Sequence, residues 1–185
     1  GDTILIHAAA GGVGLLVCQW AKHLGATVIG TVSTRAKAEL ASSHGCDHPI
    51  LYLDESFVGR VRELTNGEGV PVVYDSVGRD TFDGSLDCLR PLGLMVTFGQ
   101  SSGPVPPLAI HELTAHGSLF LTRPTLATYT ATREQLLANA AELFDVVKKG
   151  VVKIEINQTY PLQNAEQAHR DLESRKTTGA TVLLP

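Results

Sequence analysis

A glycine-rich stretch near the start of the chain has the residue types and spacing of a dinucleotide-binding loop. The stretch is HAAAGGVG at residues 7–14, where a β-branched run gives way to a helical pattern. Ala9, Gly11 and Gly14 take the three slots of G-x-G-x-x-G, so alanine replaces the first glycine. A glycine in the second slot has no side chain, so a pyrophosphate can approach the backbone there. A small residue in the third slot allows close helix–strand packing. A helix starting near Gly12 would offer its free N–H groups to the same anion.

The residues after the second predicted strand indicate which dinucleotide such a loop would bind. NAD sites normally have Asp or Glu at this point to hold the ribose 2′-hydroxyl. Here the segment is GTVSTRAK at residues 30–37, which has no acidic residue and contains the cations Arg35 and Lys37. Cations suit a 2′-phosphate, so the segment favours NADP. The alternative is that Arg35 and Lys37 only solvate the exposed first turn of a helix.

Short β-branched runs alternate with helical stretches over the first two thirds of the chain. The strand patterns lie at Thr3–Ala8, Thr27–Val32, Ile50–Tyr52, Val70–Asp75, Leu94–Phe98 and Ser118–Thr122. The helical patterns lie at Gly12–Leu24, Arg35–His44, Phe57–Thr65 and Asp80–Leu89. This alternation predicts an α/β, doubly wound fold with a six-stranded parallel sheet covered by helices on both faces. In this context, dinucleotide binding is favoured over the alternative that the glycine-rich stretch is only a tight turn.

The pattern changes after about residue 127. One long amphipathic helix is predicted from Ala127 to Lys149, with Gly150 ending it. Its apolar face would consist of Leu136, Leu137, Ala140, Leu143, Phe144 and Val147. Strand patterns at 153–160 and 181–184 then flank a short helix at 164–174, and this tail does not continue the alternation cleanly. We therefore expect a dinucleotide-binding domain at residues 1–150 and a distinct tail at 151–185.

Composition and charge restrict the classes of partner. Of the 185 residues, 43% are hydrophobic and 18% are charged, which is typical of a globular protein. The net charge is −4 and basic residues do not cluster, so a nucleic-acid partner is not expected. No apolar run approaches a membrane span, no signal peptide is evident, and three widely spaced cysteines fit a cytoplasmic protein. The sequence begins directly with a strand pattern, so we expect its start to be a domain boundary within a longer protein.

A second pattern, GQSSG at residues 99–103, fits the G-x-S-x-G motif of hydrolases. A histidine for a catalytic triad could come from His111, His116 or His169. The motif must lead straight into a helix, however, and the prolines at positions 104, 106 and 107 disfavour one. The hydrolase interpretation is therefore the weaker one.

The segment HGCDH at residues 44–48 contains three potential metal ligands. Their alternate spacing, in a turn that leads into a strand, does not direct them toward one ion. A helix C-cap is the better interpretation, and no metal site is predicted anywhere in the chain.

Five longer stretches resemble the NADPH:quinone oxidoreductases of the zinc-free medium-chain dehydrogenase/reductase superfamily, which include the zeta-crystallin-like enzymes. They are AAAGGVG, VIGTVSTRAKAELA, VVYDSVGRDTFDGSLDCLRPLGLMVTFGQSSG, GSLFLTRPTL and AHRDLESRKTTGATVLLP. The resemblance runs from Gly1 to Pro185 and implies a Rossmann fold. It also implies an N-terminal GroES-like domain, missing here, that forms much of the substrate cleft. The tail from about Lys153 would pack back onto that domain.

The resemblance also assigns cofactor-binding residues by position. It implies that the diphosphate lies beside Ala10, Gly11, Gly12 and Val13. The adenosine ribose and its 2′-phosphate would be surrounded by Ser33, Lys37, Tyr52 and Arg175. The nicotinamide half would be lined by Ser76, Val77, Phe98, Gly99 and Ser101. The strand at 118–122 would be the edge of a homodimer.

The function expected from this resemblance is reduction of a small-molecule quinone or a similar conjugated carbonyl by NADPH. No residue of this chain is predicted to act as a catalytic acid or base. The alternatives are a zinc-free enoyl or alkenal reductase with the same cofactor residues, and a non-enzymatic NADPH-binding protein.

Overall fold

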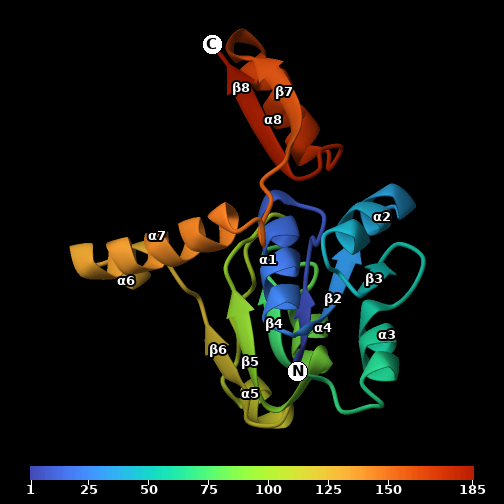
Figure 1. Ribbon diagram of the computed structural model, residues 1–185. Coiled ribbons are helices and arrows are strands. Elements are labelled where there is room, and N and C mark those ends of the chain that lie inside the picture. Colours follow the sequence, from blue (N-terminus) through green and yellow to red (C-terminus); the bar gives the residue numbers. More distant parts are fainter.

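A six-stranded parallel sheet forms the centre of the computed structural model, which describes all 185 residues (Figure 1). Its strands are β1 (Thr3–Ile6), β2 (Thr27–Val32), β3 (His48–Leu51), β4 (Val70–Asp75), β5 (Leu89–Thr97) and β6 (Phe120–Thr122). They lie in the order β3-β2-β1-β4-β5-β6, and every pairing is parallel. The predicted doubly wound fold is confirmed. The strand order reverses between β1 and β4, and ligands bind such sheets at the carboxyl ends of the strands beside this point.

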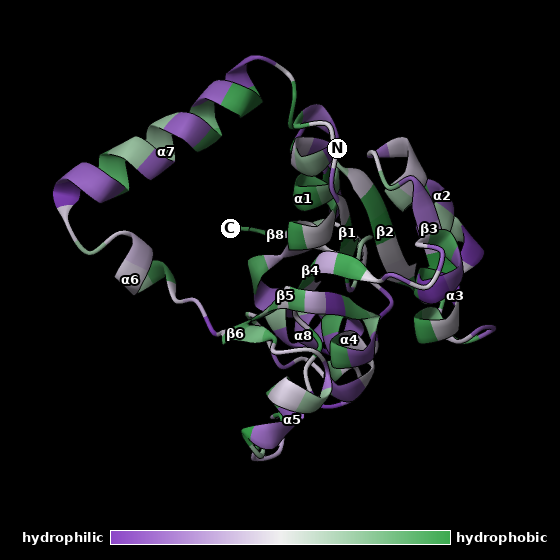
Figure 2. Cartoon of the chain, turned by 90° about the horizontal axis from the view of Figure 1, so that it is seen from below, coloured by the Kyte–Doolittle hydropathy of each residue, from purple (hydrophilic) through white to green (hydrophobic).

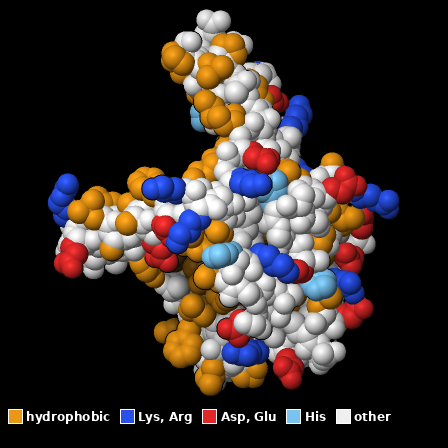
Figure 3. All heavy atoms as spheres, in the orientation of Figure 1, with side chains coloured by type: hydrophobic (Ala, Val, Ile, Leu, Met, Phe, Trp, Pro, Cys, Tyr) orange, Lys and Arg blue, Asp and Glu red, His pale blue; other side chains and the backbone are white.

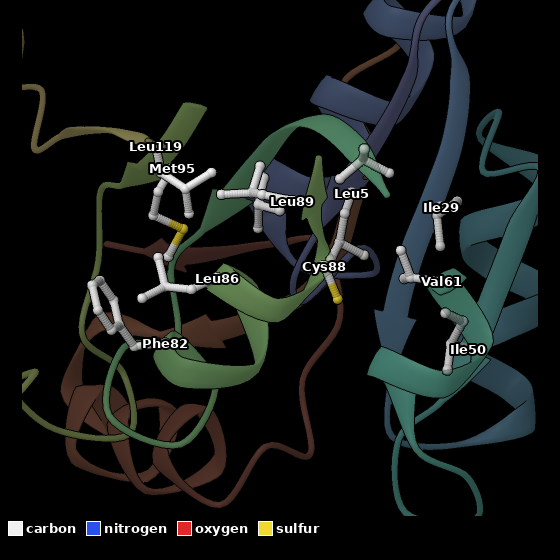
Figure 4. Packing of buried hydrophobic residues seen from close by; sticks show 12 residues of the cluster. Leu5, Ile29, Ile50, Val61, Phe82, Leu86, Cys88, Leu89, Met95 and Leu119 are labelled. Atoms are coloured by element: carbon white, nitrogen blue, oxygen red, sulfur yellow. The ribbon is translucent and has the colours of Figure 1, made fainter. Parts of the chain in front are cut away.

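Helices cover both faces of the sheet. They are α1 (Gly12–His23), α2 (Arg35–Ser43), α3 (Phe57–Leu64), α4 (Phe82–Cys88) and the short α5 (His111–Ala115). In β1, Leu5 belongs to a buried cluster with residues of α3 and α4 (Figure 4), whereas Ile4 and Ile6 belong to a second cluster with residues of α1 and α2. The alternation of side chains along a strand therefore buries β1 on both faces.

Several strand boundaries differ from the predicted ones for local backbone reasons. β1 ends at Ile6 instead of Ala8, because Ala8 turns with a φ of 55°. β6 starts two residues late, after Ser118 with a φ of 58°. β5 starts at Leu89, five residues before the predicted Leu94, and its pairing with β4 shifts register there. Residues in the left-handed region mark turns or irregularities that a β-branched pattern does not reveal.

The single long helix predicted at 127–149 is wrong. Two helices form instead, α6 (Leu126–Tyr129) and α7 (Arg133–Lys148). The Thr132 hydroxyl accepts a hydrogen bond from the Gln135 N–H, and the Gln135 side chain accepts one from the Thr132 N–H. This reciprocal pair is a capping box, which starts a new helix at this point. The T-x-x-Q spacing was its signal in the sequence.

The α6–α7 segment stands away from the sheet (Figures 1 and 2). Most of the apolar side chains expected on one face of the helix are exposed, including Leu137 and Phe144, and only Val146 is buried. Figure 3 shows hydrophobic side chains on the surface of this segment and of the tail. Neither surface is covered by the rest of the chain.

The tail forms a small β–α–β unit of its own. It comprises β7 (Ile156–Pro161), a single 3-10 turn at Leu162–Asn164, α8 (Ala165–Glu173) and β8 (Ala180–Leu184). β7 and β8 pair in parallel as a separate two-stranded sheet. The expected strand–helix–strand order of the tail is confirmed, and its strands do not join the main sheet. Helix α8 supplies the crossover that the two parallel strands need. The tail lies on the side to which the strands of the main sheet point (Figure 1). None of the helices is both long and apolar enough to cross a membrane.

Candidate functional site at the carboxyl ends of the strands

The glycine-rich loop brings bare backbone to the start of α1. Gly11 is the N-cap of this helix and makes no side-chain cap hydrogen bond, and the first turn has no acidic residue. The N–H groups that begin a helix lack intrahelical partners, so this end can receive an anion. A Cβ on Gly14 would clash with the Ala8 carbonyl oxygen and lie 2.7 Å from the Ala9 carbonyl carbon. The third slot of the fingerprint thus needs glycine for packing.

The alanine in the first slot has a matching glycine in the neighbouring strand. Ala9 is completely buried, and a Cβ on Gly30 of β2 would lie only 2.6 Å from the Ala9 Cβ. The methyl group of Ala9 fits because Gly30 has none. The departure from the usual three glycines is therefore compensated within the fold.

Two cations and a phenol meet beyond the end of β2. The Lys37 ammonium donates a hydrogen bond to the Arg175 carbonyl oxygen at 2.6 Å, and the Arg175 guanidinium donates to the Tyr52 hydroxyl at 3.2 Å. Partial burial lowers the pKa of Lys37, and the nearby Arg175 charge adds to that shift. Ser33 is half-buried at the end of β2, whereas Arg35 is exposed and lies outside the group.

The charge of this group is poorly neutralised. The carboxylate of Asp80 lies 3.9 Å from the Arg175 guanidinium, and the same carboxylate also faces Arg79 at 3.1 Å. Lys37 and Arg175 therefore offer net positive charge, with hydrogen-bond donors, to an anion of one or two charges.

The residues expected at the nicotinamide half lie on two loops that are joined to each other. Ser76 and Val77 follow β4, and the Ser76 carbonyl oxygen accepts a hydrogen bond from the Ser101 N–H at 3.2 Å. Phe98 and Gly99 follow β5, and a Cβ on Gly99 would lie 2.8 Å from the Ser76 Cα. This close approach requires glycine at position 99 and brings the two loops together at the carboxyl ends of β4 and β5.

Comparisons with known proteins connect this geometry to a family. The family described as "Zinc-binding dehydrogenase" matches residues 12–141 of the chain. The chain belongs to the zinc-binding dehydrogenase family. The quinone oxidoreductase of Pseudomonas aeruginosa is 55% identical over the whole chain, which covers 57% of that protein. The 2-haloacrylate reductase of a Burkholderia species is 50% identical, again over the whole chain and 56% of that protein.

Solved structures give the same result for the fold of this dehydrogenase domain. The Escherichia coli quinone oxidoreductase, solved in complex with NADPH, matches with a TM-score of 0.96 at 51% identity, over the whole chain and 57% of that structure. A mycobacterial protein, also solved with NADPH, matches with a TM-score of 0.97 at 51% identity, over the whole chain and 58% of that structure. The resemblance to quinone oxidoreductases and the Rossmann fold are confirmed. The chain spans about 57% of the length of these relatives.

The family name implies zinc, and the residues of this chain do not fit that ion. No three His, Cys, Asp or Glu side chains lie close enough together to hold a metal. His44 is the C-cap of α2, as predicted, and its ring lies 2.8 Å from the Leu40 carbonyl oxygen. Cys46 is buried against Gly30 in the core. The HGCDH segment is thus occupied with structural contacts.

The hydrolase interpretation finds no matching geometry in this dehydrogenase domain. Ser101 is exposed, and no helix follows it until α5 at His111. The candidate histidines are engaged elsewhere or distant, because His111 faces Glu112, His116 faces Asp87, and His169 lies on α8 of the tail. The prolines after the motif keep this segment free of helix, as predicted.

Two features of the site were not anticipated from the sequence. The tail contacts the glycine-rich loop directly, since the Gly179 N–H donates a hydrogen bond to the Ala10 carbonyl oxygen at 2.9 Å. Gly179 has a φ of 49°, and a Cβ on Gly12 would lie 3.2 Å from its carbonyl oxygen. Beneath the loops, His7 and Asp75 are buried with 1% and 0% exposure. A glycine before the last strand was the one signal for the tail contact, and nothing in the spacing indicated the buried pair.

Proposed function

We propose that this chain is the NADPH-binding domain of an enzyme that reduces quinones or related conjugated carbonyls. The observation that carries the proposal is the meeting of Lys37, Arg175 and Tyr52 beyond the end of β2, where an NAD site would have a carboxylate. The solved relatives support it, because a quinone oxidoreductase and a mycobacterial protein, each 51% identical over the length of this chain, were solved with NADPH.

Each part of the proposed site has a defined task. Bound nicotinamide would supply the reducing equivalents. The protein then has to bind the cofactor, orient it against the substrate and exclude water from the site. The backbone of Ala10, Gly11, Gly12 and Val13 would hold the diphosphate. The 2′-phosphate and its ribose would lie among Ser33, Lys37, Tyr52 and Arg175. The nicotinamide half would lie against Ser76, Val77, Phe98, Gly99 and Ser101. Substrate-side acid or base groups would come from residues outside this chain.

The division into a domain at residues 1–150 and a tail at 151–185 is part of the proposal. The tail exposes Ile154, Ile156, Leu172 and Leu184, each by at least half of its surface. A missing GroES-like domain would cover such apolar side chains. The edge strand β6 exposes Phe120 and Leu121 and would pair with a second copy. Three buried, unpaired cysteines suit the reducing cytoplasm.

The experiment is a substrate panel on the full-length protein with NADPH as reductant. Quinone-dependent NADPH oxidation is the expected result. Because a 2-haloacrylate reductase is 50% identical to the chain, halogenated acrylates and enoyl compounds belong in the same panel. Preference for an acrylate would select the enoyl-reductase alternative, and NADPH binding without turnover of any member would select a non-enzymatic role.

A further inference from the structure

A buried carboxylate holds the turn that follows β4. Asp75 has no exposed surface, and its Oδ1 accepts hydrogen bonds from the Val77 N–H at 2.7 Å and the Gly78 N–H at 3.0 Å. Its Oδ2 accepts from the hydroxyls of Thr81 at 2.8 Å and Ser85 at 3.1 Å. Four donors therefore converge on one charge, and two of them are backbone amides of the turn.

A buried histidine extends this arrangement across three strands. His7 Nε2 lies 2.9 Å from the Ser85 hydroxyl, and Nδ1 lies 2.9 Å from the Thr31 hydroxyl of β2. The single Ser85 proton already faces two acceptors, the Asp75 carboxylate and the Thr81 carbonyl oxygen. His7 must then donate from Nε2 to Ser85 and accept at Nδ1 from Thr31. The bonds thus run in one direction, from Thr31 through His7 and Ser85 to Asp75.

The turn held by Asp75 in turn holds the loop after β5. The Val77 carbonyl oxygen accepts from both the N–H and the hydroxyl of Ser102, at 2.9 and 2.8 Å. Gly78 has a φ of 90°, and a Cβ there would lie 2.8 Å from the Gly103 carbonyl oxygen. A displacement of the first turn would therefore displace the second loop as well.

We propose that Asp75 is a positioning residue for the nicotinamide half of the cofactor. Its carboxylate fixes the Val77–Gly78 turn and, through it, the loop at 99–103, without touching the cofactor itself. The inference rests on the proposed NADPH site. It also predicts that loss of Asp75 weakens binding of the nicotinamide half and spares binding of the 2′-phosphate half. The glycine-rich loop and the Lys37–Arg175 group do not depend on the two hydrogen bonds that Asp75 accepts from backbone amides.

The test uses full-length protein and two probes, NADPH and 2′,5′-ADP, which has the 2′-phosphate end but no nicotinamide. Asp75→Ala leaves the Val77 and Gly78 amides without their acceptor, so we expect the Kd for NADPH to rise about tenfold or more. The Kd for 2′,5′-ADP should change by less than about twofold. Asp83→Ala, an exposed carboxylate on the same helix as Ser85, is the matched control and should leave both values unchanged.

Asp75→Asn separates positioning from charge. Asparagine keeps an oxygen for the two amides, and the hydroxyls of Ser85 and Thr81 can turn to the Thr81 and Gly78 carbonyl oxygens, at 2.8 and 3.2 Å. This variant should therefore recover most of the NADPH affinity. If Asp75→Ala does not fold, Thr81→Val removes one donor from the same carboxylate and should still weaken NADPH selectively, by about threefold.

Equal losses for both probes, or unchanged NADPH affinity in Asp75→Ala, would overturn the positioning role while leaving the proposed function intact. A wild-type protein that binds neither probe would overturn the proposed function and the positioning role together.

Discussion

Lys37 and Arg175 are 138 residues apart in the sequence and bonded to each other in the fold. Their side chains are partly exposed, so their attraction for an anion depends on ionic strength. Arg35, two residues before Lys37, has the same charge but lies outside the group. We therefore expect cofactor preference to depend on Lys37 and Arg175 rather than on the basic segment as a whole.

Lys37→Ala and Arg175→Ala should each weaken NADPH binding by about tenfold, because each removes a proposed charge-assisted contact to the 2′-phosphate. NADH lacks that phosphate, so its affinity should hardly change. Titration of both cofactors by calorimetry measures the effect, and added salt should weaken NADPH more than NADH. Arg35→Ala is the control. A large NADPH-specific loss in this control would mean that the wrong cation was assigned.

His7 links stability to pH. Burial lowers its pKa to about 4 from an ordinary 6.5, with the Asp75 charge opposing the shift. Below about pH 6.5 His7 binds a proton in the unfolded chain but not in the native state. Its contribution to the free energy of unfolding is therefore complete above this pH and is lost on acidification. When the pH is lowered from about 7.5 to about 5, the free energy of unfolding of the wild type should fall by roughly 2 kcal/mol more than that of His7→Gln, as measured by urea unfolding. His169 is exposed, so the control variant His169→Gln should lose as much unfolding free energy as the wild type over this pH range.

Residue-level prediction from the sequence succeeded where a local pattern determines the contact. Gly14 and the capping role of His44 follow from spacing alone. The meeting of Arg175 with Lys37 was reached only through resemblance, since no local rule joins residues so far apart. Asp75 was missed because a carboxylate at the end of a strand is usually solvated, and its burial here depends on donors from the turn after β4 and from the start of α4.

At the scale of elements, the sheet centre was predictable and its margins were not. β2 and β4 have the predicted bounds because their apolar runs end at polar residues. The start of β5 and the break between α6 and α7 depend on backbone conformation and capping, which compete with the apolar pattern. Apolar side chains of α7 and of the β6 edge also remain exposed in this chain.

Leu121→Asp should convert a dimer to monomers, because Leu121 is 40% exposed on the edge strand and a charge there would oppose pairing with a second copy. Sedimentation velocity at micromolar concentration measures this. Leu119, by contrast, is 6% exposed and belongs to the core, so Leu119→Asp should unfold the protein instead. A wild-type protein that sediments as a monomer would remove the basis for the dimer.

At the scale of the whole molecule, the chain contains a complete sheet but about 57% of the length of its relatives. The isolated chain should bind NADPH and turn over quinones very poorly, because the proposed N-terminal domain would form one wall of the cleft and water would not be excluded without it. Initial rates of NADPH oxidation by this chain and by the full-length protein provide the comparison. Equal rates would mean that the rest of the protein is dispensable for the chemistry.

The tail contacts the glycine-rich loop through Gly179 and carries Arg175, so the proposed discrimination between dinucleotides would not reside in residues 1–150 alone. An engineer who trims the protein at residue 150 to obtain a minimal cofactor module would keep the sheet, the loop and Lys37. The same cut would discard Arg175, and with it one of the two charges proposed to face the 2′-phosphate. The preference of such a module for NADPH over NADH should be about tenfold smaller than that of the longer chain, so a transplanted cofactor module needs the tail to keep its full specificity.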